Sequence, residues 1–193
     1  MLADLRERKK AKTRAAIQSE ALRLFREHGY AATTVEDIIE AAEVSESTFY
    51  RYFPTKADVV LTDDYDPLMV EAFLAQPPGT RSLSAMRQAF RAVFSALSDE
   101  ERDESQERTA LILSVPELRS SLLDQMAGTM KMLVDAVAKR SGLPSSDSAV
   151  RALAGAVGGA AMVVMLDLSD DPSVDFLERF DEILAQFETG FTI

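Results

Sequence analysis

The sequence predicts an all-α protein, with a small N-terminal three-helix domain of the helix-turn-helix type and a larger C-terminal helical bundle. Three observations predict this class. Apolar residues recur at helical spacing along most of the chain, strand-like alternation is nearly absent, and proline, glycine and capping residues separate the periodic segments. With 193 residues, of which 47% are hydrophobic, the chain can bury a sizeable core.

The first helix is predicted from an apolar stripe at helical spacing, which ends at Gly29, a residue that can close a helix in the left-handed conformation. The stripe consists of Ile17, Ala21, Leu24, Phe25 and His28. Residues 1–14 hold six basic and two acidic side chains, a local charge of +4. This basic arm either binds a polyanion or is a solvated, frayed terminus. No apolar run follows it, so we expect no secretory signal.

Two short helices joined by a tight turn are predicted over residues 35–42 and 45–53. Thr34 and Ser45 cap them, and Thr55 caps the next helix, because a threonine or serine side chain can accept from the first free backbone N–H groups. Paired helices of this length have helix-turn-helix geometry, in which the second helix can enter the major groove of DNA.

The second short helix divides by face. Phe49 and Phe53 are four residues apart and are expected to point into the bundle with Val44. The residues expected to point outward are Glu46, Ser47, Tyr50 and Arg51. Two interpretations remain open from spacing alone. The hydroxyl and tyrosine side chains contact DNA, or they only cap helices and complete the core.

Longer helices are predicted beyond this pair. A new helix starts at Asp66-Pro67, because proline is well tolerated in the first helical turn, and it precedes a break at Pro77-Pro78-Gly79. The remaining helices are expected near 82–98, 100–114, 116–140, 147–168 and 173–190.

The segment ALRLFREHGYAATTVEDIIEAAEVSESTFYRYFPTKADVV carries a more specific pattern. Its informative positions are Phe25, Gly29, Tyr30, Thr33, Thr34, Ile38, Ala41, Ala42, Val44, Ser45, Thr48, Phe49, Tyr50, Tyr52, Phe53 and Lys56. In order and spacing, residues 10–60 resemble the DNA-binding domain of the tetracycline-repressor (TetR) family of bacterial transcriptional regulators. The stretch RYFPTKADVVLTDDYDP is also similar to the branch that includes regulators of mycofactocin gene clusters.

The resemblance implies that the helix from Ser45 is the recognition helix. The predicted DNA-binding residues are Thr33, Thr34, Ser45, Glu46, Ser47, Thr48, Tyr50, Arg51, Tyr52 and Lys56. Glu46 can accept a hydrogen bond from cytosine N4, so it is expected to affect base preference. Glu43 departs from the family, which commonly has glycine in the turn. If its backbone is left-handed, glutamate costs about 1 kcal/mol there.

The resemblance also implies a DNA-binding domain over residues 1–60 and an effector-binding and dimerisation domain over 61–193. Dimerisation is expected through the last two long helices, where small residues permit a close approach. The predicted interface residues are Ala152, Gly155, Gly159, Phe176, Phe180, Ile183 and Phe187. Close packing within one subunit is the alternative explanation of these small residues.

An effector pocket is predicted among the apolar residues of the body. Its candidate residues are Phe90, Phe94, Leu97, Leu111, Val115, Leu118, Leu122, Met126, Met130, Met162 and Met165. Stripes of methionine and phenylalanine also occur in ordinary cores, so both interpretations stay open. An apolar lining suits a small apolar or amphipathic molecule.

The charge distribution agrees with this division. Residues 1–60 hold ten basic and ten acidic side chains, whereas residues 61–193 hold 11 and 22, which accounts for the whole net charge of −11. We therefore expect a cytoplasmic, homodimeric repressor that a small molecule releases from a near-palindromic DNA operator. The alternative is a DNA-binding regulator without a small-molecule effector, which is controlled by a protein partner or acts as an activator.

Other classes of function find little support in the sequence. The chain has no cysteine, no hydrolase nucleophile motif and no recognisable metal or dinucleotide site, so we expect no enzyme, metal or cofactor. The longest uncharged stretch runs for 15 residues between Arg151 and Asp167. A membrane span needs about 20, so we expect no membrane association.

Overall fold

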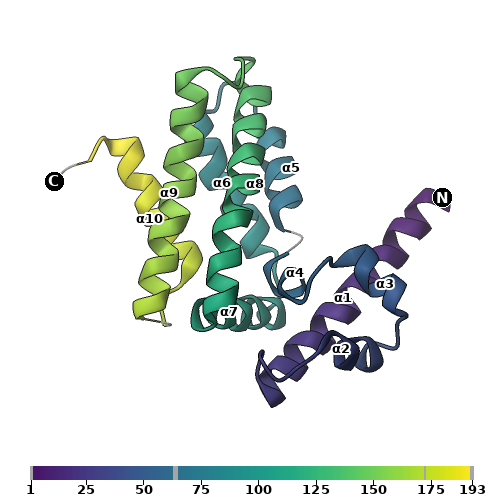
Figure 1. The fold of residues 1–193 in the computed structure, drawn as a ribbon. Helices are drawn as coiled ribbons and strands as arrows, with labels where there is room; N and C mark the ends of the chain where they lie inside the picture. The colour runs from purple at the N-terminus through teal and green to yellow at the C-terminus, as the bar shows by residue number, and fades with distance from the viewer. Residues whose placement is uncertain (1, 63–64, 172, 192–193) are drawn as a thin grey trace. The chain divides into compact units, whose positions relative to one another are not determined.

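We describe the chain from a computed structural model, which covers residues 2–62, 65–171 and 173–191. All regular structure in these ranges is α-helix (Figure 1), as predicted. Contacts group the chain into two compact units. The first combines Met1–Thr62 with the short segment Val115–Ser121, and the second contains the rest of the chain. The predicted boundary at residue 60 did not include this short segment.

The first unit contains four helices from the N-terminal part of the chain, α1 (Leu2–His28), α2 (Val35–Ala41), α3 (Glu46–Tyr52) and α4 (Lys56–Leu61). Helix α1 contacts α2 and α4, and α2 contacts α3. The apolar stripe of α1 is buried as predicted, apart from His28, which is exposed. The main buried side chains are Ile17, Ala21, Leu24, Phe25, Ile38, Phe49, Phe53, Val59 and Val60.

Local hydrogen bonds begin the short helices at the predicted places. Thr34, Ser45 and Thr55 each accept a hydrogen bond from the backbone N–H three residues later. The carboxylates of Asp37 and Asp58 in turn accept a hydrogen bond from the backbone N–H of Thr34 and Thr55, so α2 and α4 both have a complete capping box. The three predicted caps are therefore confirmed.

The turn between α2 and α3 contains a strained residue. Glu43 has φ 52°, in the left-handed region that glycine occupies without a steric cost. Gly29 has φ 86° after α1, as predicted for a residue that closes a helix. The tight turn therefore forms although glutamate is unfavourable in this conformation. The turn determines the orientation of α3 relative to α2.

The second unit contains the longer helices. They are α5 (Tyr65–Ala75), α6 (Ser82–Ser95), α7 (Asp99–Ser114), α8 (Pro116–Ser141), α9 (Ser148–Asp170) and α10 (Phe176–Thr189). Only the first turns of α8 belong to the other unit. Helix α10 packs against α6 and α9. The fully buried side chains in this core include Phe73, Val164, Phe180 and Leu184.

Two helix ends differ from prediction because a cap lies beyond them. Helix α6 ends at Ser95 rather than near residue 98, since Ser98 caps α7 by accepting from the N–H of Glu101. Helix α10 begins at Phe176 rather than near 173, since Asp175 accepts from the N–H of Glu178. A residue that caps the next helix has extended backbone geometry and does not continue the previous one.

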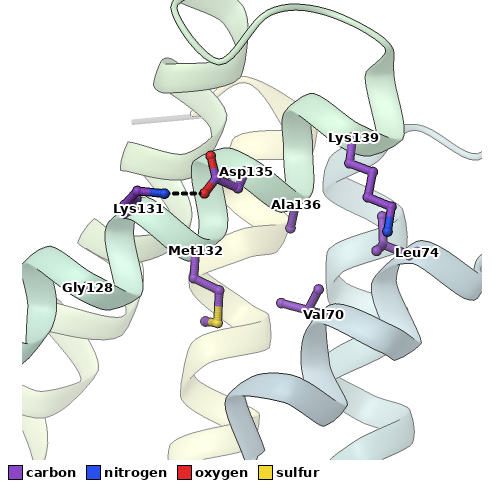
Figure 2. A pocket seen from close by; sticks show the side chains of 8 residues that line it. All are labelled: Val70, Leu74, Gly128, Lys131, Met132, Asp135, Ala136 and Lys139. Atoms are coloured by element: carbon purple, nitrogen blue, oxygen red, sulfur yellow. Dashed lines mark hydrogen bonds and ion pairs between the residues drawn. The ribbon is translucent and has the colours of Figure 1, made fainter.

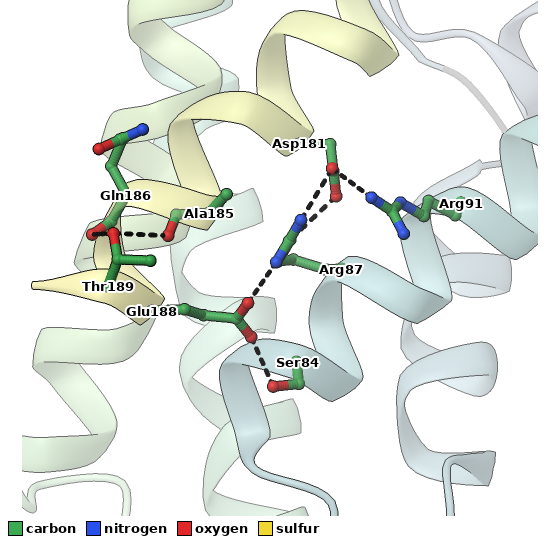
Figure 3. Close-up of polar contacts among 8 residues, drawn as sticks. All are labelled: Ser84, Arg87, Arg91, Asp181, Ala185, Gln186, Glu188 and Thr189. Atoms are coloured by element: carbon green, nitrogen blue, oxygen red, sulfur yellow. Dashed lines mark hydrogen bonds and ion pairs between the residues drawn. The ribbon is translucent and has the colours of Figure 1, made fainter.

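An ion-pair cluster joins α6 to α10 (Figure 3). Arg87 donates from Nε and Nη2 to the two carboxylate oxygens of Asp181, both at 2.9 Å. Arg87 also pairs with Glu188, which accepts from the Ser84 hydroxyl, and Arg91 pairs with Asp181. The Arg87 and Asp181 side chains are only 17% and 18% exposed. We call this cluster the α6–α10 clamp.

Candidate functional site

The predicted recognition helix α3 has one buried and one exposed face. Phe49 and Phe53 are fully buried, which anchors the helix in the first unit. The side chains on the other face, Glu46, Ser47, Tyr50 and Arg51, are all exposed. The predicted division of this helix is thus confirmed. Tyr50 is 46% exposed, so its ring and hydroxyl are accessible to a partner.

Hydroxyl groups are linked at the start of α3. The Ser45 hydroxyl lies 3.1 Å from that of Ser47 and 2.8 Å from that of Thr48, and it also accepts from the Thr48 N–H. Each hydroxyl can both donate and accept, so it can exchange a neighbour for a phosphate oxygen or a base edge. This arrangement suits polar recognition without a fixed charge.

Positive charge lies at the other end of α3. The Arg51 guanidinium carbon lies 5.2 Å from the centre of the Tyr52 ring, so the two side chains stack. Stacking limits the rotamers that the exposed Arg51 samples, which lowers the entropy cost of holding a phosphate or a guanine.

Negative charge lies beside α3 on the outer face of α2 and the turn. Four glutamates and two apolar side chains surround a shallow hollow of about 380 Å³. They are Glu36, Glu40, Glu43 and Glu46, with Ile39 and Val44. Carboxylates repel phosphate, so this side of the motif disfavours the DNA backbone. The exposed Ser45, Ser47, Tyr50 and Arg51 side chains of the motif carry no negative charge.

Two predicted DNA-binding residues point elsewhere. Thr33 is 2% exposed, and its hydroxyl lies within hydrogen-bond distance of the carbonyl oxygens of Gly29 (3.0 Å) and Leu24 (3.3 Å). The Lys56 ammonium donates to the carbonyl oxygens of Tyr30 (2.8 Å) and Thr33 (3.0 Å). The prediction is therefore corrected for the Thr33 side chain, which is enclosed. Lys56 is already bound to the loop between α1 and α2.

Three further residues, Tyr30, Glu117 and Gln18, form contacts within the first unit that the sequence analysis did not predict. Tyr30 is 5% exposed, and its hydroxyl donates to Glu117 at 3.3 Å. Burial, and then the charge of Glu117, raises the pKa of Tyr30 well above its ordinary value. Gln18 donates from its amide to the carbonyl oxygens of Val59 and Thr62 at the end of α4. Partners this far apart in the chain leave no pattern of spacing by which to find them.

The structure places some of the predicted effector residues in packed cores. Phe90 and Phe94 belong to a row of packed aromatic rings. The ring centres of Phe90 and Phe180 are 4.3 Å apart, and those of Phe94 and Phe176 are 6.1 Å apart. Leu118 is fully buried in the first unit, so it is corrected as a lining residue of the body.

A different set of residues surrounds a groove between α5 and α8 (Figure 2). The groove has a volume of about 350 Å³. It is lined by Val70, Leu74, Gly128, Lys131, Met132, Asp135, Ala136 and Lys139. None of the eleven predicted effector residues lines it.

Helix α9 exposes small and apolar side chains. The predicted interface residues Ala152, Gly155 and Gly159 are exposed, and Val163 and Leu166 extend the same apolar surface with 44% and 60% exposure. The opposite face of α9 is buried in the core. Among the described residues, α9 is the one helix long and apolar enough to cross a membrane, by length and composition alone. Core helices of soluble proteins also pass this test, but those are mostly buried, whereas 28% of the apolar window of α9 is buried in one chain.

The predicted interface residues of α10 are less accessible. Phe176, Ile183 and Phe187 are half-buried against the core of their own unit. Phe180 is fully buried and packs on the Phe90 ring. The prediction for Phe180 is therefore corrected, since no atom of its side chain is available to a second subunit.

A helix-turn-helix with a polar, outward-facing second helix, joined to a helical body, defines the class of DNA-binding transcriptional regulators. Residues 17–62 match the family model for bacterial regulatory proteins of the tetR family, and residues 80–192 match that for the MftR C-terminal domain. The chain belongs to the TetR family, and its C-terminal domain is of the MftR type.

Named relatives agree with this assignment. The chain is 44% identical to the transcriptional regulator TcmR of Streptomyces glaucescens over 99 residues, which cover 50% of this chain and 44% of TcmR. It is 28% identical over 178 residues to the protein named MftR, for mycofactocin biosynthesis transcriptional regulator, of Mycobacterium tuberculosis. That match covers 89% of this chain and 87% of MftR. The chain thus spans less than half the length of TcmR.

Solved structures share the fold. A TetR-family regulator from Mesorhizobium loti superposes with a TM-score of 0.57 at 18% identity, covering 95% of this chain and 98% of the other. Thermus thermophilus FadR, a repressor solved with lauroyl-CoA, gives 0.55 at 21% identity, with coverage of 93% and 95%.

Proposed function

We propose that this chain is a homodimeric repressor, which acts in the cytoplasm on a near-palindromic DNA operator and is released by a small-molecule effector. The observation that carries the proposal is the exposed face of α3, where hydroxyls, Tyr50 and Arg51 surround a helix anchored by buried phenylalanines. Two such helices in a two-fold dimer read half-sites about 34–36 Å apart on one side of DNA.

The surface of α9 supports the homodimer. Its exposed face combines small residues, which allow helices to approach closely, with Val163 and Leu166, which are apolar and uncovered in one chain. A two-fold axis through this face places the same residues of two chains against each other. Burying such a surface is favourable by about 25 cal/mol per Å² of apolar area.

The acidic body supports restricted contact with DNA. Residues 61–193 hold 22 acidic and 11 basic side chains, so the body repels phosphate and only the first unit engages DNA. Effector control rests on the size of the body, since reading DNA requires no further bundle. It also agrees with FadR, which shares the fold and was solved with lauroyl-CoA.

The DNA-binding part is tested by selecting operators from random double-stranded DNA and measuring affinity in gel-shift titrations. We expect a sequence with two related half-sites, bound by two chains. A selected pool without sequence preference would contradict the proposal. Thermal-shift screening of small molecules, followed by operator release with each hit, tests effector control.

The dimer is tested by analytical ultracentrifugation of Leu166→Lys, which places a charge in the proposed interface. We expect the variant to sediment as a monomer and to bind single half-sites only weakly. Glu178→Lys, on an exposed position of α10, is the control and is expected to remain dimeric. A dimeric Leu166→Lys variant with unchanged dissociation would place the interface elsewhere.

A further inference from the structure

The groove between α5 and α8 combines an apolar floor with a positively charged end (Figure 2). Val70 and Leu74 come from α5, and Met132 and Ala136 face them from α8. The Met132 and Val70 side chains project into the space between the two helices. Ala136 is almost fully buried, whereas the other three are half-buried and leave apolar surface for contact.

The charges at the rim are not balanced. Lys131 pairs with Asp135 on the same helix at 2.6 Å, so these two groups neutralise each other. Lys139 has no hydrogen-bond or ion-pair partner in the described part of the chain, and its side chain extends toward Leu74 at the end of the groove. One positive charge is therefore left over, in a part of the chain with a large excess of acid.

The other end of the groove contains a glycine that packing within the chain does not explain. Gly128 lies inside α8, where glycine costs about 1 kcal/mol relative to alanine. Apart from the adjoining backbone of α8 itself, no atom lies within 4 Å of the place that a Cβ would take, and Gly128 does not have a positive φ. The missing side chain therefore keeps space open at the groove and serves no contact between helices of this chain.

These features lie on one face of α8. Gly128, Met132 and Lys139 follow one another at i, i+4 and i+11, so they form a stripe about 16 Å long. An elongated molecule in the groove would contact the apolar floor along its length and meet the ammonium group at one end.

We propose that the α5–α8 groove binds an amphiphilic anion, whose aliphatic chain lies on Val70, Leu74 and Met132 and whose carboxylate head pairs with Lys139. If the ligand of this groove is also the effector, the proposal rests on the proposed function of the chain. The binding site itself is tested without DNA. The positive charge selects a negative head, and the elongated apolar floor suits an extended aliphatic chain.

Binding is measured by titration calorimetry with decanoate, below the concentration at which it forms micelles, and with decan-1-ol and decyltrimethylammonium. We expect decanoate to bind and the other two, which have the same chain, to bind at least about tenfold more weakly, the contribution of one charge-assisted hydrogen bond. Equal affinity for all three would overturn the proposal, since it would show that Lys139 plays no part.

Three variants localise the site. Lys139→Gln is expected to weaken decanoate binding about tenfold, and Gly128→Leu to abolish it by filling the open end. Arg151→Gln removes an exposed positive charge from α9 and is the matched control, with unchanged affinity. Circular dichroism shows that each variant is folded, and Gly128→Ala, a smaller change with better helix propensity, serves if the leucine variant does not fold. Unchanged binding by Lys139→Gln and the glycine variant contradicts the site.

Operator release separates the site from the proposed function. Decanoate binding that depends on Lys139 but leaves the operator complex intact would support the groove and contradict its role as the effector site. Operator release by another compound, with no decanoate binding, would support effector control and overturn the groove proposal.

Discussion

The Lys56 ammonium group lies 4.1 Å from the centre of the Tyr30 ring and donates a 2.8 Å hydrogen bond to the Tyr30 carbonyl oxygen. Lys56 is the first residue of α4, only a few positions after the recognition helix, whereas Tyr30 follows α1. The contact therefore fixes the end of the helix-turn-helix against the loop that precedes it. The sequence alone assigned this lysine to DNA.

Replacing Lys56 tests which assignment is right. Lys56→Met keeps the apolar stem and removes both donated hydrogen bonds, so we expect the free energy of unfolding to fall by about 1–2 kcal/mol. Urea denaturation measures this. If the lysine does not contact phosphate, the slope of log affinity against log salt on the selected operator stays unchanged. Unchanged stability with a slope reduced by about one would favour the phosphate contact.

Relieving the strained turn is expected to stabilise the protein. Glu43→Gly removes the steric cost of a left-handed glutamate but increases the freedom of the unfolded chain, so we expect a net gain of about 0.5–1 kcal/mol. Glu40→Gly, inside α2, is the matched control and should lose about 1 kcal/mol. Thermal and urea unfolding report both changes. A loss of stability in both variants would show that the turn is not strained in solution.

The exposed face of α3 makes two separable predictions for DNA binding. Tyr50→Phe removes a hydroxyl suited to the backbone, so affinity should fall several-fold for all sequences alike. Glu46→Gln should change which bases are preferred, because a carboxylate only accepts hydrogen bonds whereas an amide also donates. Repeating the operator selection with each variant distinguishes the two. A changed consensus for Tyr50→Phe would reverse its assignment.

The α6–α10 clamp is expected to fail in acid. Hydrogen bonds from Arg87 and then Arg91 hold the pKa of Asp181 below its ordinary value of 3.8. The Ser84 hydroxyl, followed by Arg87, similarly lowers the pKa of Glu188 from 4.5. A lowered folded pKa means that the unfolded chain binds protons first as the pH falls. The stabilisation is thus complete above about pH 5 and disappears as the pH drops through the folded pKa values.

Asp181→Asn tests the clamp directly. We expect it to lower the free energy of unfolding by about 1–2 kcal/mol at pH 7, since Arg87, which is largely buried, loses one of its two charged partners and keeps only Glu188. The difference from the unmodified chain should shrink as the pH falls below about 4. Glu182→Gln alters an exposed ion pair within α10 and should change little. A difference that stays constant down to pH 3 would refute the proposed titration.

Two adjacent glycines in α9 provide a matched pair. A Cβ on Gly158 would overlap the end of the Met130 side chain, whereas one on Gly159 would meet no atom beyond the adjoining backbone of α9. Both gain helix propensity as alanine, by up to about 1 kcal/mol, but Gly158→Ala must also displace Met130. We therefore expect the Gly159→Ala variant to have a higher free energy of unfolding than the Gly158→Ala variant. If α9 forms the dimer interface, we also expect Gly159→Ala to weaken the dimer more. Unfolding and sedimentation experiments measure the two effects separately.

The sequence determined the local structure of this protein. Caps at Thr34, Ser45 and Thr55 and the inward phenylalanines of α3 depend on residues three or four positions apart, so they are visible as spacing. Family-specific residues in the same stretch identified the DNA-binding motif. Each of these features depends on a continuous segment, and distant parts of the chain do not alter it.

Only the tertiary structure decided which side chains remain available. Thr33 and Lys56 match the recognition motif in sequence, but carbonyl oxygens of the folded first unit already hold their polar groups. Phe180 lies on the predicted interface helix, but the Phe90 ring covers it. The α5–α8 groove brings together segments more than fifty residues apart. Helical spacing defines a face but not what covers it, because the covering atoms come from elsewhere in the chain.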